Sequence, residues 1–590
     1  MRNKYDYTLR VVLLRWAACA AIALRCAGAD AAGDSAIPAT RCLRPFEIAV
    51  EASPEERMPA INVINESGMA GELCDNLHEG TWYSPSGPGP LPGTAGDTPV
   101  PDAAVWIRFE FDRVHALREM RVWNYNESIG RGLKTVEIHS TADGRSWTNL
   151  GRFEFAVASG KPGYGHNTTI DFAGRRVRGI AIYGITNHGE PLHLYGLSEV
   201  RFVVDDDNTT AMHSPFAGQL PPLNVTLQLR RGLAIDRTYH AIPDQPRFTS
   251  EDARYIKSLG FGFVKILINP QFHKEGVELR NMEFVDASIR RVVDAGLPVL
   301  VCVHPEADFK RTMFSDRGEF DRLCAWYERL GAHLAGNWTP SQFAFQQMTE
   351  PFGDSGSLFA WNHWNRLLPE MWHAIRRGMP KHTLVLSGTQ SGRIGGLFPL
   401  RPVPDGNVMY AFSYYEPFAF TFQGAPWMKQ TSATYPYLRN VPYPADLPAI
   451  LQETDSLIFE PPDDVMRARA RNELLNYGTQ QWNRERHAES LGMLAQWSDY
   501  YQGKLAFIAG EFGCYQGAAP PADRCRYVRD VREVLEEFGC AWSYWSYNET
   551  CTIMDDRLPR KAFGSPRESQ PDQELLRALL DRRDPAPGPR

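Results

Sequence analysis

The sequence predicts two folded domains of different classes, an all-β sandwich or jelly roll followed by an α/β domain of the (β/α)8 TIM-barrel type. The first observation is length, because 590 residues are enough for one large barrel and a smaller partner. The second is composition: 43% hydrophobic and 23% charged residues can form large cores, which excludes a disordered chain. The third is a change of hydrophobic period near residue 224, from strand-like alternation to strands that alternate with amphipathic helices.

The first 32 residues have the features of an export signal. Four basic residues open the chain (Arg2, Lys4, Arg10 and Arg15), an apolar stretch follows over Trp16–Leu24, and small residues around Ala29 fit a cleavage site. A lipid anchor on Cys26 is the alternative, although Arg25 directly before it does not suit that processing. We therefore expect residues 1–32 to be removed and the protein to be secreted, either extracellular or periplasmic.

The net charge and the cysteine spacing limit which kinds of partner and bound group we expect. The 63 basic and 70 acidic residues give a net charge of −7, so no broad basic field exists for nucleic acid. Beyond the N-terminus, no apolar run reaches the ~20 residues of a membrane-spanning helix. Eight cysteines follow the signal, none with C-x-x-C spacing, so we expect disulfides and neither a metal nor a cofactor. The close pairs Cys514/Cys525 and Cys540/Cys551 are the natural candidates, with connectivity left open.

Residues 41–204 have the pattern of an all-β module. Short runs alternate apolar and polar side chains, and Gly, Pro and Asn separate them, which favours a sandwich or jelly roll. The predicted strands are Val105–Phe111, Met120–Trp123, Val136–His139, Ile180–Tyr183 and Val200–Val203. The polar, Pro-containing stretch 205–224 is expected to be a linker, across which few contacts run between the domains.

Residues 225–582 alternate strands and helices, as an eightfold barrel requires. The predicted strands are Leu229–Ile235, Phe263–Ile268, Pro298–Val303, Phe343–Gln347, Thr383–Ser387, Val408–Phe412, Leu505–Ala509 and Ala541–Trp545. The predicted helices are Ser250–Leu259, Glu283–Ala295, Glu319–Ala335, Trp361–Arg377, Asp463–Tyr500, Arg524–Phe538 and Gln573–Asp581. Residues 583–590 are expected to form a flexible tail.

Two glutamates lie where the chemistry of such a barrel takes place. Glu350 follows the fourth predicted strand and directly precedes Pro351. Glu511 follows the seventh predicted strand, within the sequence Gly510-Glu-Phe-Gly513. Two carboxylates at the C-terminal rim suit glycoside hydrolysis, in which one protonates the leaving oxygen and the other attacks the anomeric carbon or activates water. The alternative for either glutamate alone is a rim salt bridge.

The surrounding motifs resemble glycoside hydrolase family 5, the retaining barrel enzymes that include cellulases and mannanases. The resemblance covers about Leu229 to Asp581, and its motifs are Arg231-Gly-Leu233, Thr349-Glu-Pro351, Tyr410–Phe418 with Gln423–Trp427, Gly510-Glu-Phe-Gly513 and Trp542–Tyr547. It implies that Glu350 is the acid/base, Glu511 the nucleophile and Trp545 a sugar-stacking platform. Tyr414 and Trp427 are second candidates for lining the cleft.

The chain departs from the family pattern around these two glutamates. Lys265 stands in place of an arginine, Thr349 in place of the asparagine before the acid/base, and Ser413 in place of the histidine that precedes Tyr415. Lysine cannot make the two-pronged contact of arginine, and threonine lacks the two amide donors. The resemblance assigns substrate contacts to six residues: His304, Thr349, Tyr415, Trp545, Lys265 and Ser413.

The N-terminal module resembles the discoidin-like (factor V/VIII type C, galactose-binding-like) fold. The matching stretches are His78–Tyr83, Trp106–Phe109, Thr141–Trp147 and Gly196–Phe202. This fold serves sugar, protein and lipid adhesion, so its ligand is inferred from the attached barrel. Trp82 and Tyr83 are candidates for a binding loop.

These observations favour a secreted retaining glycoside hydrolase that acts on a polysaccharide or oligosaccharide of β-glucan, mannan or exopolysaccharide type. The sandwich would hold it on a glycan or a cell surface. The first alternative is a non-catalytic barrel that binds sugar and has lost its activity through the changes at Lys265, Thr349 and Ser413. The retention of both glutamates argues against this alternative. The second is an adhesion protein, which leaves the large barrel unexplained.

Overall fold

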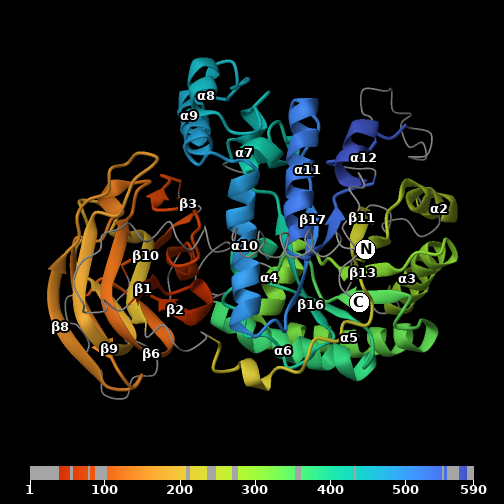
Figure 1. Ribbon diagram of the computed structural model, residues 1–590, viewed down its shortest axis with the longest axis horizontal. Helices are drawn as coiled ribbons and strands as arrows, with labels where there is room; N and C mark the ends of the chain where they lie inside the picture. The colour runs from red at the N-terminus through yellow and green to blue at the C-terminus, as the bar shows by residue number, and fades with distance from the viewer. Residues whose placement is uncertain are drawn as a thin grey trace, which may run out of the picture.

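The computed structural model shows two domains side by side, a β-rich domain and a barrel (Figure 1). It describes residues 39–53, 57–77, 80–86, 103–206, 213–235, 248–268, 277–351, 361–430, 433–547, 550–554 and 570–580. The predicted signal, residues 1–32, and the predicted tail, residues 583–590, lie outside the described residues. Among the described helices, none combines the length and the apolar character that crossing a bilayer requires.

The N-terminal domain is built on one antiparallel sheet with the order β1-β10-β6-β9-β7-β8, to which β2 and β5 add by pairing with β6 and β10. The strands are β1 (Ala39–Cys42), β2 (Ile48–Ala52), β5 (Trp82–Pro85), β6 (Val105–Asn124), β7 (Thr135–Thr141), β8 (Trp147–Glu154), β9 (Thr168–Gly184) and β10 (Leu194–Asp206). A small hairpin, β3 (Met69–Ala70) and β4 (Leu73–Cys74), stands apart. The domain is therefore strand-rich, as predicted.

Strand β6 joins two stretches that the sequence predicts as separate strands. Its register against β9 shifts between Glu110 and His115, so β6 pairs with β2 before the shift and with β10 after it. Such irregularities bend a long strand and let one sheet curl around a core. Phe109, Phe111 and Phe202 stack edge to face in this core.

The C-terminal domain is a closed barrel of eight parallel strands in chain order, which confirms the predicted eightfold barrel. Fully buried apolar runs such as Phe263–Ile268 form the strands, as parallel sheets covered on both faces require. The strands are β11 (Arg231–Ile235), β12 (Phe263–Ile268), β13 (Val299–Val303), β14 (Phe343–Gln346), β15 (Leu384–Ser387), β16 (Val408–Tyr414), β17 (Ala506–Phe512) and β18 (Ala541–Tyr544).

Helices surround the barrel, and two of them replace the single helix predicted over Asp463–Tyr500. The chain breaks at Gln481, whose φ is +52°, and Asn483 then caps the second helix by accepting from the amide of Arg486. Three short helices, α4 (Ala307–Ser315), α7 (Phe418–Thr421) and α8 (Leu447–Glu453), were not predicted. The helices are α2 (Ser250–Leu259), α3 (Val277–Asp294), α4 (Ala307–Ser315), α5 (Arg317–Asn337), α6 (Trp361–Gly378), α7 (Phe418–Thr421), α8 (Leu447–Glu453), α9 (Asp464–Thr479), α10 (Arg484–Tyr500), α11 (Pro521–Glu537) and α12 (Gln573–Leu580).

The two predicted disulfides are not formed, because all eight cysteines of the described residues are free thiols. Cys540 precedes β18 and Cys551 follows it, so the strand holds them at opposite ends of the barrel. Cys514 follows β17 and Cys525 lies in α11, and both are buried. Burial raises the pKa of Cys525 to about 11, so it persists as an unreactive thiol.

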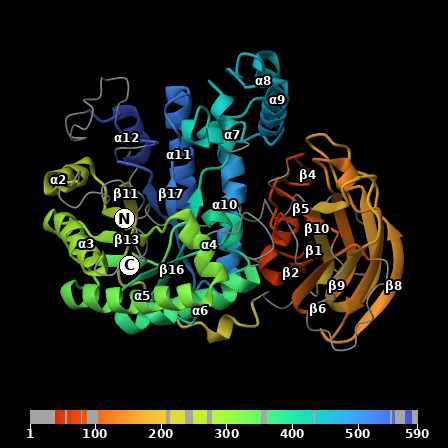
Figure 2. The same ribbon diagram turned by 180° about the vertical axis from the view of Figure 1, so that it is seen from behind.

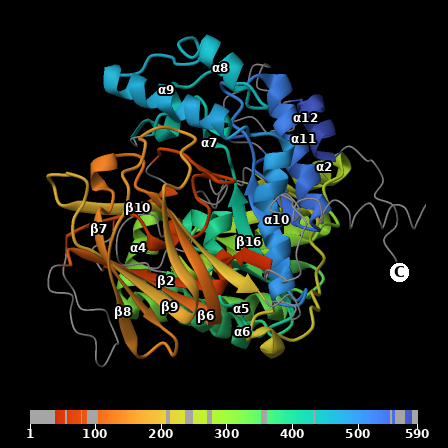
Figure 3. The same ribbon diagram turned by 60° about the vertical axis from the view of Figure 1, so that its left-hand side comes forward.

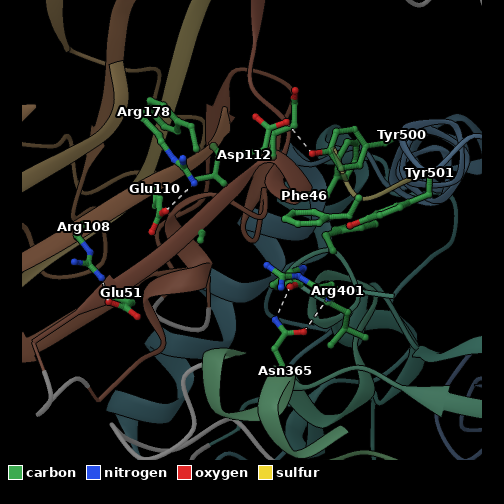
Figure 4. Close-up of a pocket in the computed structure, with 18 of the residues that line it drawn as sticks. Phe46, Glu51, Arg108, Glu110, Asp112, Arg178, Asn365, Arg401, Tyr500 and Tyr501 are labelled. Atoms are coloured by element: carbon green, nitrogen blue, oxygen red, sulfur yellow. Dashed lines mark hydrogen bonds and ion pairs between the residues drawn. The ribbon is translucent and has the colours of Figure 1, made fainter. Parts of the chain in front are cut away.

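The two domains share an interface, so the expectation of few contacts between them is wrong. The N-terminal domain covers one side of the barrel beside α10 (Figures 2 and 3). Tyr500 at the end of α10 donates to Asp112 of β6 over 2.9 Å, and Asn476 of α9 donates to Asn76 over 2.8 Å. A groove of about 550 Å³ runs along this interface, with Phe46 of the N-terminal domain facing Tyr500 and Tyr501 (Figure 4).

Candidate active site

The predicted site residues gather at one end of the barrel because parallel strands share their C-terminal edge. Glu511 lies near the end of β17 and is level with Ser413 of the neighbouring strand β16. Thr349 and Glu350 follow β14, His304 follows β13, and Trp545 follows β18. This is the edge at which barrel enzymes place their chemistry.

Three donors converge on the carboxylate of Glu511, which is 6% exposed. Lys265 Nζ donates to Oε1 over 2.9 Å, and Thr349 Oγ1 donates to the same oxygen over 3.0 Å. Tyr415 Oη lies 3.4 Å from Oε2. The arrangement suits an ionised carboxylate, with both oxygens facing donors.

Lys265 comes from the middle of β12 and is completely buried. Its ammonium also donates to the carbonyl of Gly510 over 3.0 Å. Burial alone lowers the pKa of a lysine, but the negative charge of Glu511 outweighs this and raises the pKa of Lys265 above its ordinary value. The two side chains therefore form a buried ion pair.

Glu350 is half-buried and has a left-handed backbone with φ of +49°. Burial and the charge of Glu511 raise the pKa of its carboxyl from 4.5 to about 7, against the opposing effects of Lys310 and Lys265 and a hydrogen bond with Ser413. The ammonium of Lys310, from α4, donates to the Glu350 carbonyl over 3.0 Å. The two glutamates thus lie in different environments, one paired with a lysine and one that retains its proton near neutral pH.

His304 and Trp545 flank the glutamates from the neighbouring strands. The backbone amide of His304 donates to the carbonyl of Ile268 at the end of β12, over 2.8 Å. The backbone amide of Trp545 donates to Phe512, next to Glu511, over 2.9 Å, and the indole donates to Thr550 over 3.0 Å. Trp545 is partly exposed at this rim.

Two of the weaker candidates, Tyr414 and Trp82, are buried in the cores of their domains. Tyr414 is fully buried and contacts His487 of α10 over 2.8 Å, so it belongs to the barrel core. Trp82 is also fully buried, in strand β5, so it cannot stack on a ligand of the N-terminal domain. Trp427 is 43% exposed and meets Phe422 and Tyr515 edge to face.

The sequence did not identify Lys310 as a site residue. Its helix α4 was not predicted, and its contact is with a backbone carbonyl, which leaves no motif in the sequence. It is 3% exposed, and a lysine buried so fully without a role is uncommon. That burial could be detected only once the fold was known.

One cluster in the described residues has ligand atoms close enough to hold a metal ion, namely Glu47, Asp112 and His115. Glu47 is already paired with Arg41 at 2.7 Å. Asp112 accepts from His115, Arg113 and Tyr500. These carboxylates are neutralised by arginines, which argues against a cation there.

An eightfold parallel barrel with two carboxylates at the ends of its fourth and seventh strands is an arrangement that suits the glycoside hydrolase class of barrel. Within that class, the sequence profile of the cellulase family (glycosyl hydrolase family 5) matches residues 238–550. The chain therefore belongs to glycosyl hydrolase family 5.

Curated relatives of the chain are endoglucanases. It is 25% identical over 248 residues to Endoglucanase 3 of Fibrobacter succinogenes, a match over 42% of this chain and 36% of that protein. It is 26% identical over 312 residues to Endoglucanase C of Acetivibrio thermocellus, over 51% of this chain and 84% of that one. The chain thus spans about a third of the length of the first relative and most of the second.

Solved structures similar to the chain include the endoglucanase Cel5A of Thermotoga maritima, at 22% identity and a TM-score of 0.45. That match covers 60% of this chain and 97% of Cel5A. Another is the clostridial cellulose synthase subunit Z of Clostridioides difficile, at 19% identity and a TM-score of 0.46, over 60% and 100% of the two chains.

Proposed function

We propose that the protein is a retaining glycoside hydrolase of endoglucanase type, which cleaves O-glycosidic bonds in a β-glucan or mannan-like polysaccharide. The observation that carries the proposal is the pair of unlike carboxylates. Glu511 is ion-paired with a buried lysine, and the pKa of Glu350 is raised to about 7. Two neighbouring carboxyl groups in such different environments can act as a nucleophile and as an acid, although both belong to glutamate residues.

In the first step, the Glu511 carboxylate attacks the anomeric carbon while Glu350 gives its proton to the departing glycosidic oxygen. The glycosidic bond breaks as the ester bond to Glu511 forms. Glu350, now ionised, then takes a proton from water, whose oxygen attacks the same carbon and releases Glu511. Retention requires the two carboxyl groups to lie ~5–5.5 Å apart.

The departures from the family pattern alter how Glu511 is held. Thr349 bonds directly to Glu511, so its hydroxyl orients the nucleophile. Lys265 supplies the charge as a single contact, without the fork of an arginine. Tyr415 supplies a third donor. The chain thus retains an anchored nucleophile with a different set of donors.

The test is a panel of carboxymethyl-cellulose, mixed-linkage β-glucan and glucomannan, with reducing ends as the readout. Glu511→Gln should abolish turnover on every substrate that the wild type cleaves. Glu350→Ala should still release a good leaving group, and added azide should yield a β-glycosyl azide. Glu453→Gln, at an exposed helix position, is the matched control and should behave as wild type. Full activity in Glu511→Gln, or sugar binding without hydrolysis in the wild type, would overturn the proposal in favour of a binding barrel.

We propose further that the protein is secreted and that the sandwich, whose strand-rich fold is compatible with a discoidin-like module, binds a glycan or a cell surface. The support is the export-like N-terminus together with a substrate that is too large to enter cells. Fractionation of the native host tests the location. Pull-down of the full chain with insoluble glycans, in the presence of a saturating soluble substrate, tests the second binding site.

A further inference from the structure

A strained turn packs against Glu350. It follows β15 and consists of Gln390, Ser391 and Gly392, which have left-handed φ values of +54°, +53° and +73°. Left-handed backbone is unfavourable for residues that carry a Cβ and persists only where the surroundings enforce it. A Cβ added to Gly392 would lie 3.4 Å from the Glu350 Cα and 3.5 Å from the Ser413 Oγ, so the turn is in contact with the acid/base and its hydrogen-bond partner.

The turn makes hydrogen bonds both to the barrel and to the N-terminal domain. On the barrel side, the amide of Ser391 donates to the carbonyl of Pro351 over 3.0 Å, directly after Glu350. On the other side, Gln390 is held by the sandwich. Its Nε2 donates to Asn62 Oδ1 over 2.8 Å, and its Oε1 accepts from Asn65 Nδ2 at 3.3 Å.

The two asparagines are themselves fixed within the sandwich. Asn62 lies in the short 3-10 helix Ala60–Val63, is 3% exposed and donates to the carbonyl of Thr81 over 2.9 Å. Asn65 is 7% exposed and accepts from the amide of Ser67 over 3.0 Å. Both amides are therefore buried and oriented before they meet Gln390, as a positioning contact requires.

We propose that the N-terminal sandwich is a structural part of the active site: Asn62 and Asn65 hold Gln390, and the Gln390–Gly392 turn positions Glu350. The sandwich then completes the wall behind the acid/base, in addition to any glycan that it binds itself. The inference rests on the proposed function for its kinetic consequence, but the contact itself can be tested without activity. Asn62, Asn65 and Gln390 are positioning residues, since they act through the turn.

The first experiment measures hydrogen exchange in the full-length protein. Asn62→Ala and Gln390→Ala should each speed exchange in peptides that contain Ser391, and the double variant should add little, since the two residues act through one contact. Asn476→Ala is the matched control, because it removes an interdomain amide contact of the same kind, to Asn76, on α9. Unchanged exchange at Ser391 in both single variants would overturn the proposal, whether or not the protein is an enzyme.

The second experiment measures kinetics on a cellulosic oligosaccharide and on a dinitrophenyl glycoside. General acid catalysis contributes roughly 10²–10⁴-fold, so partial misplacement of Glu350 should lower kcat about tenfold on the oligosaccharide. The dinitrophenyl glycoside, whose leaving group needs no proton, should show little change in its first step. The basic limb of the pH profile should move to lower pH, because water that enters beside Glu350 lowers the pKa of its carboxyl.

The outcomes separate the two proposals. A wild type that is inactive on every glycan refutes the proposed function, and exchange at Ser391 still decides whether the sandwich holds the turn. If the enzyme is active, the leaving-group dependence and the pH profile of Asn62→Ala and Gln390→Ala are compared with those of the control Asn476→Ala. The same behaviour in all three variants refutes the positioning role. Equal losses in the first step on both substrates, measured as kcat/KM, would also refute it, since loss of proton donation alone should spare the first step with the dinitrophenyl leaving group.

Discussion

Replacing Glu350 with glutamine should stabilise the protein above neutral pH. In the unfolded chain this carboxyl ionises near pH 4.5, whereas in the folded protein burial and the charge of Glu511 raise its pKa to about 7. The folded state therefore holds a proton that the unfolded state has already released. As the pH rises from 4.5 to 7, the wild type loses stability relative to Glu350→Gln, which carries no titrating group at this position.

The magnitude follows from the two pKa values. Each tenfold difference in proton affinity corresponds to about 1.4 kcal/mol, so the full difference approaches about 3 kcal/mol above pH 7. Glutamine has the same shape as the protonated acid, so packing beside Ser413 is preserved. The difference should be close to zero at pH 4 and complete by pH 8.

Urea unfolding at pH 4, 5, 6, 7 and 8, followed by tryptophan fluorescence, measures this difference directly. Glu453→Gln controls for the loss of a surface charge. A stability difference between wild type and Glu350→Gln that is flat with pH would refute the reasoning, as would a wild type that gains stability relative to the variant as pH rises.

The remaining predictions concern the groups around the glutamates. Lys265→Met should cost about 3–5 kcal/mol in urea unfolding by leaving the buried Glu511 charge unpaired, and Glu511→Gln in the same chain should recover most of it; no recovery would contradict the ion pair. Trp545→Ala should raise KM about fivefold with kcat retained, since a stacking contact contributes about 1 kcal/mol; an unchanged KM would exclude the platform role. Thiol titration of the unfolded, unreduced full-length protein should find Cys514, Cys525, Cys540 and Cys551 free, and mapped disulfides among them would contradict the structure.

The barrel was predictable from sequence because its strands are short apolar runs with one possible environment. Phe263–Ile268 is buried at every position, and the predicted bounds match the observed strand. The positions of Glu350 and Glu511 followed from the same logic, because strand ends of a parallel barrel meet at one edge. Lys265 could be placed beside Glu511 only through the family resemblance, since a lysine inside an apolar strand carries no local signal of its partner.

Contacts made between distant segments were not predictable. Tyr414 and Tyr415 are adjacent, but side chains alternate along a strand, so one enters the core against α10 and the other reaches Glu511. The contact of Gln390 with Asn62 joins residues 328 positions apart through neutral amides, which form no motif. The cysteine pairs were predicted from their short separation in the sequence. This separation does not show that strand β18 lies between Cys540 and Cys551 and keeps them apart.

The most direct test of the central claim is to trap the covalent intermediate and map it. Incubation with dinitrophenyl 2-deoxy-2-fluoro-β-cellobioside, followed by peptide mapping, should place a single fluoroglycosyl ester on Glu511, and the label should be lost in Glu511→Gln. A label on Glu350, or an enzyme that turns over cellulosic substrates without ever acquiring a label on Glu511, would contradict the account.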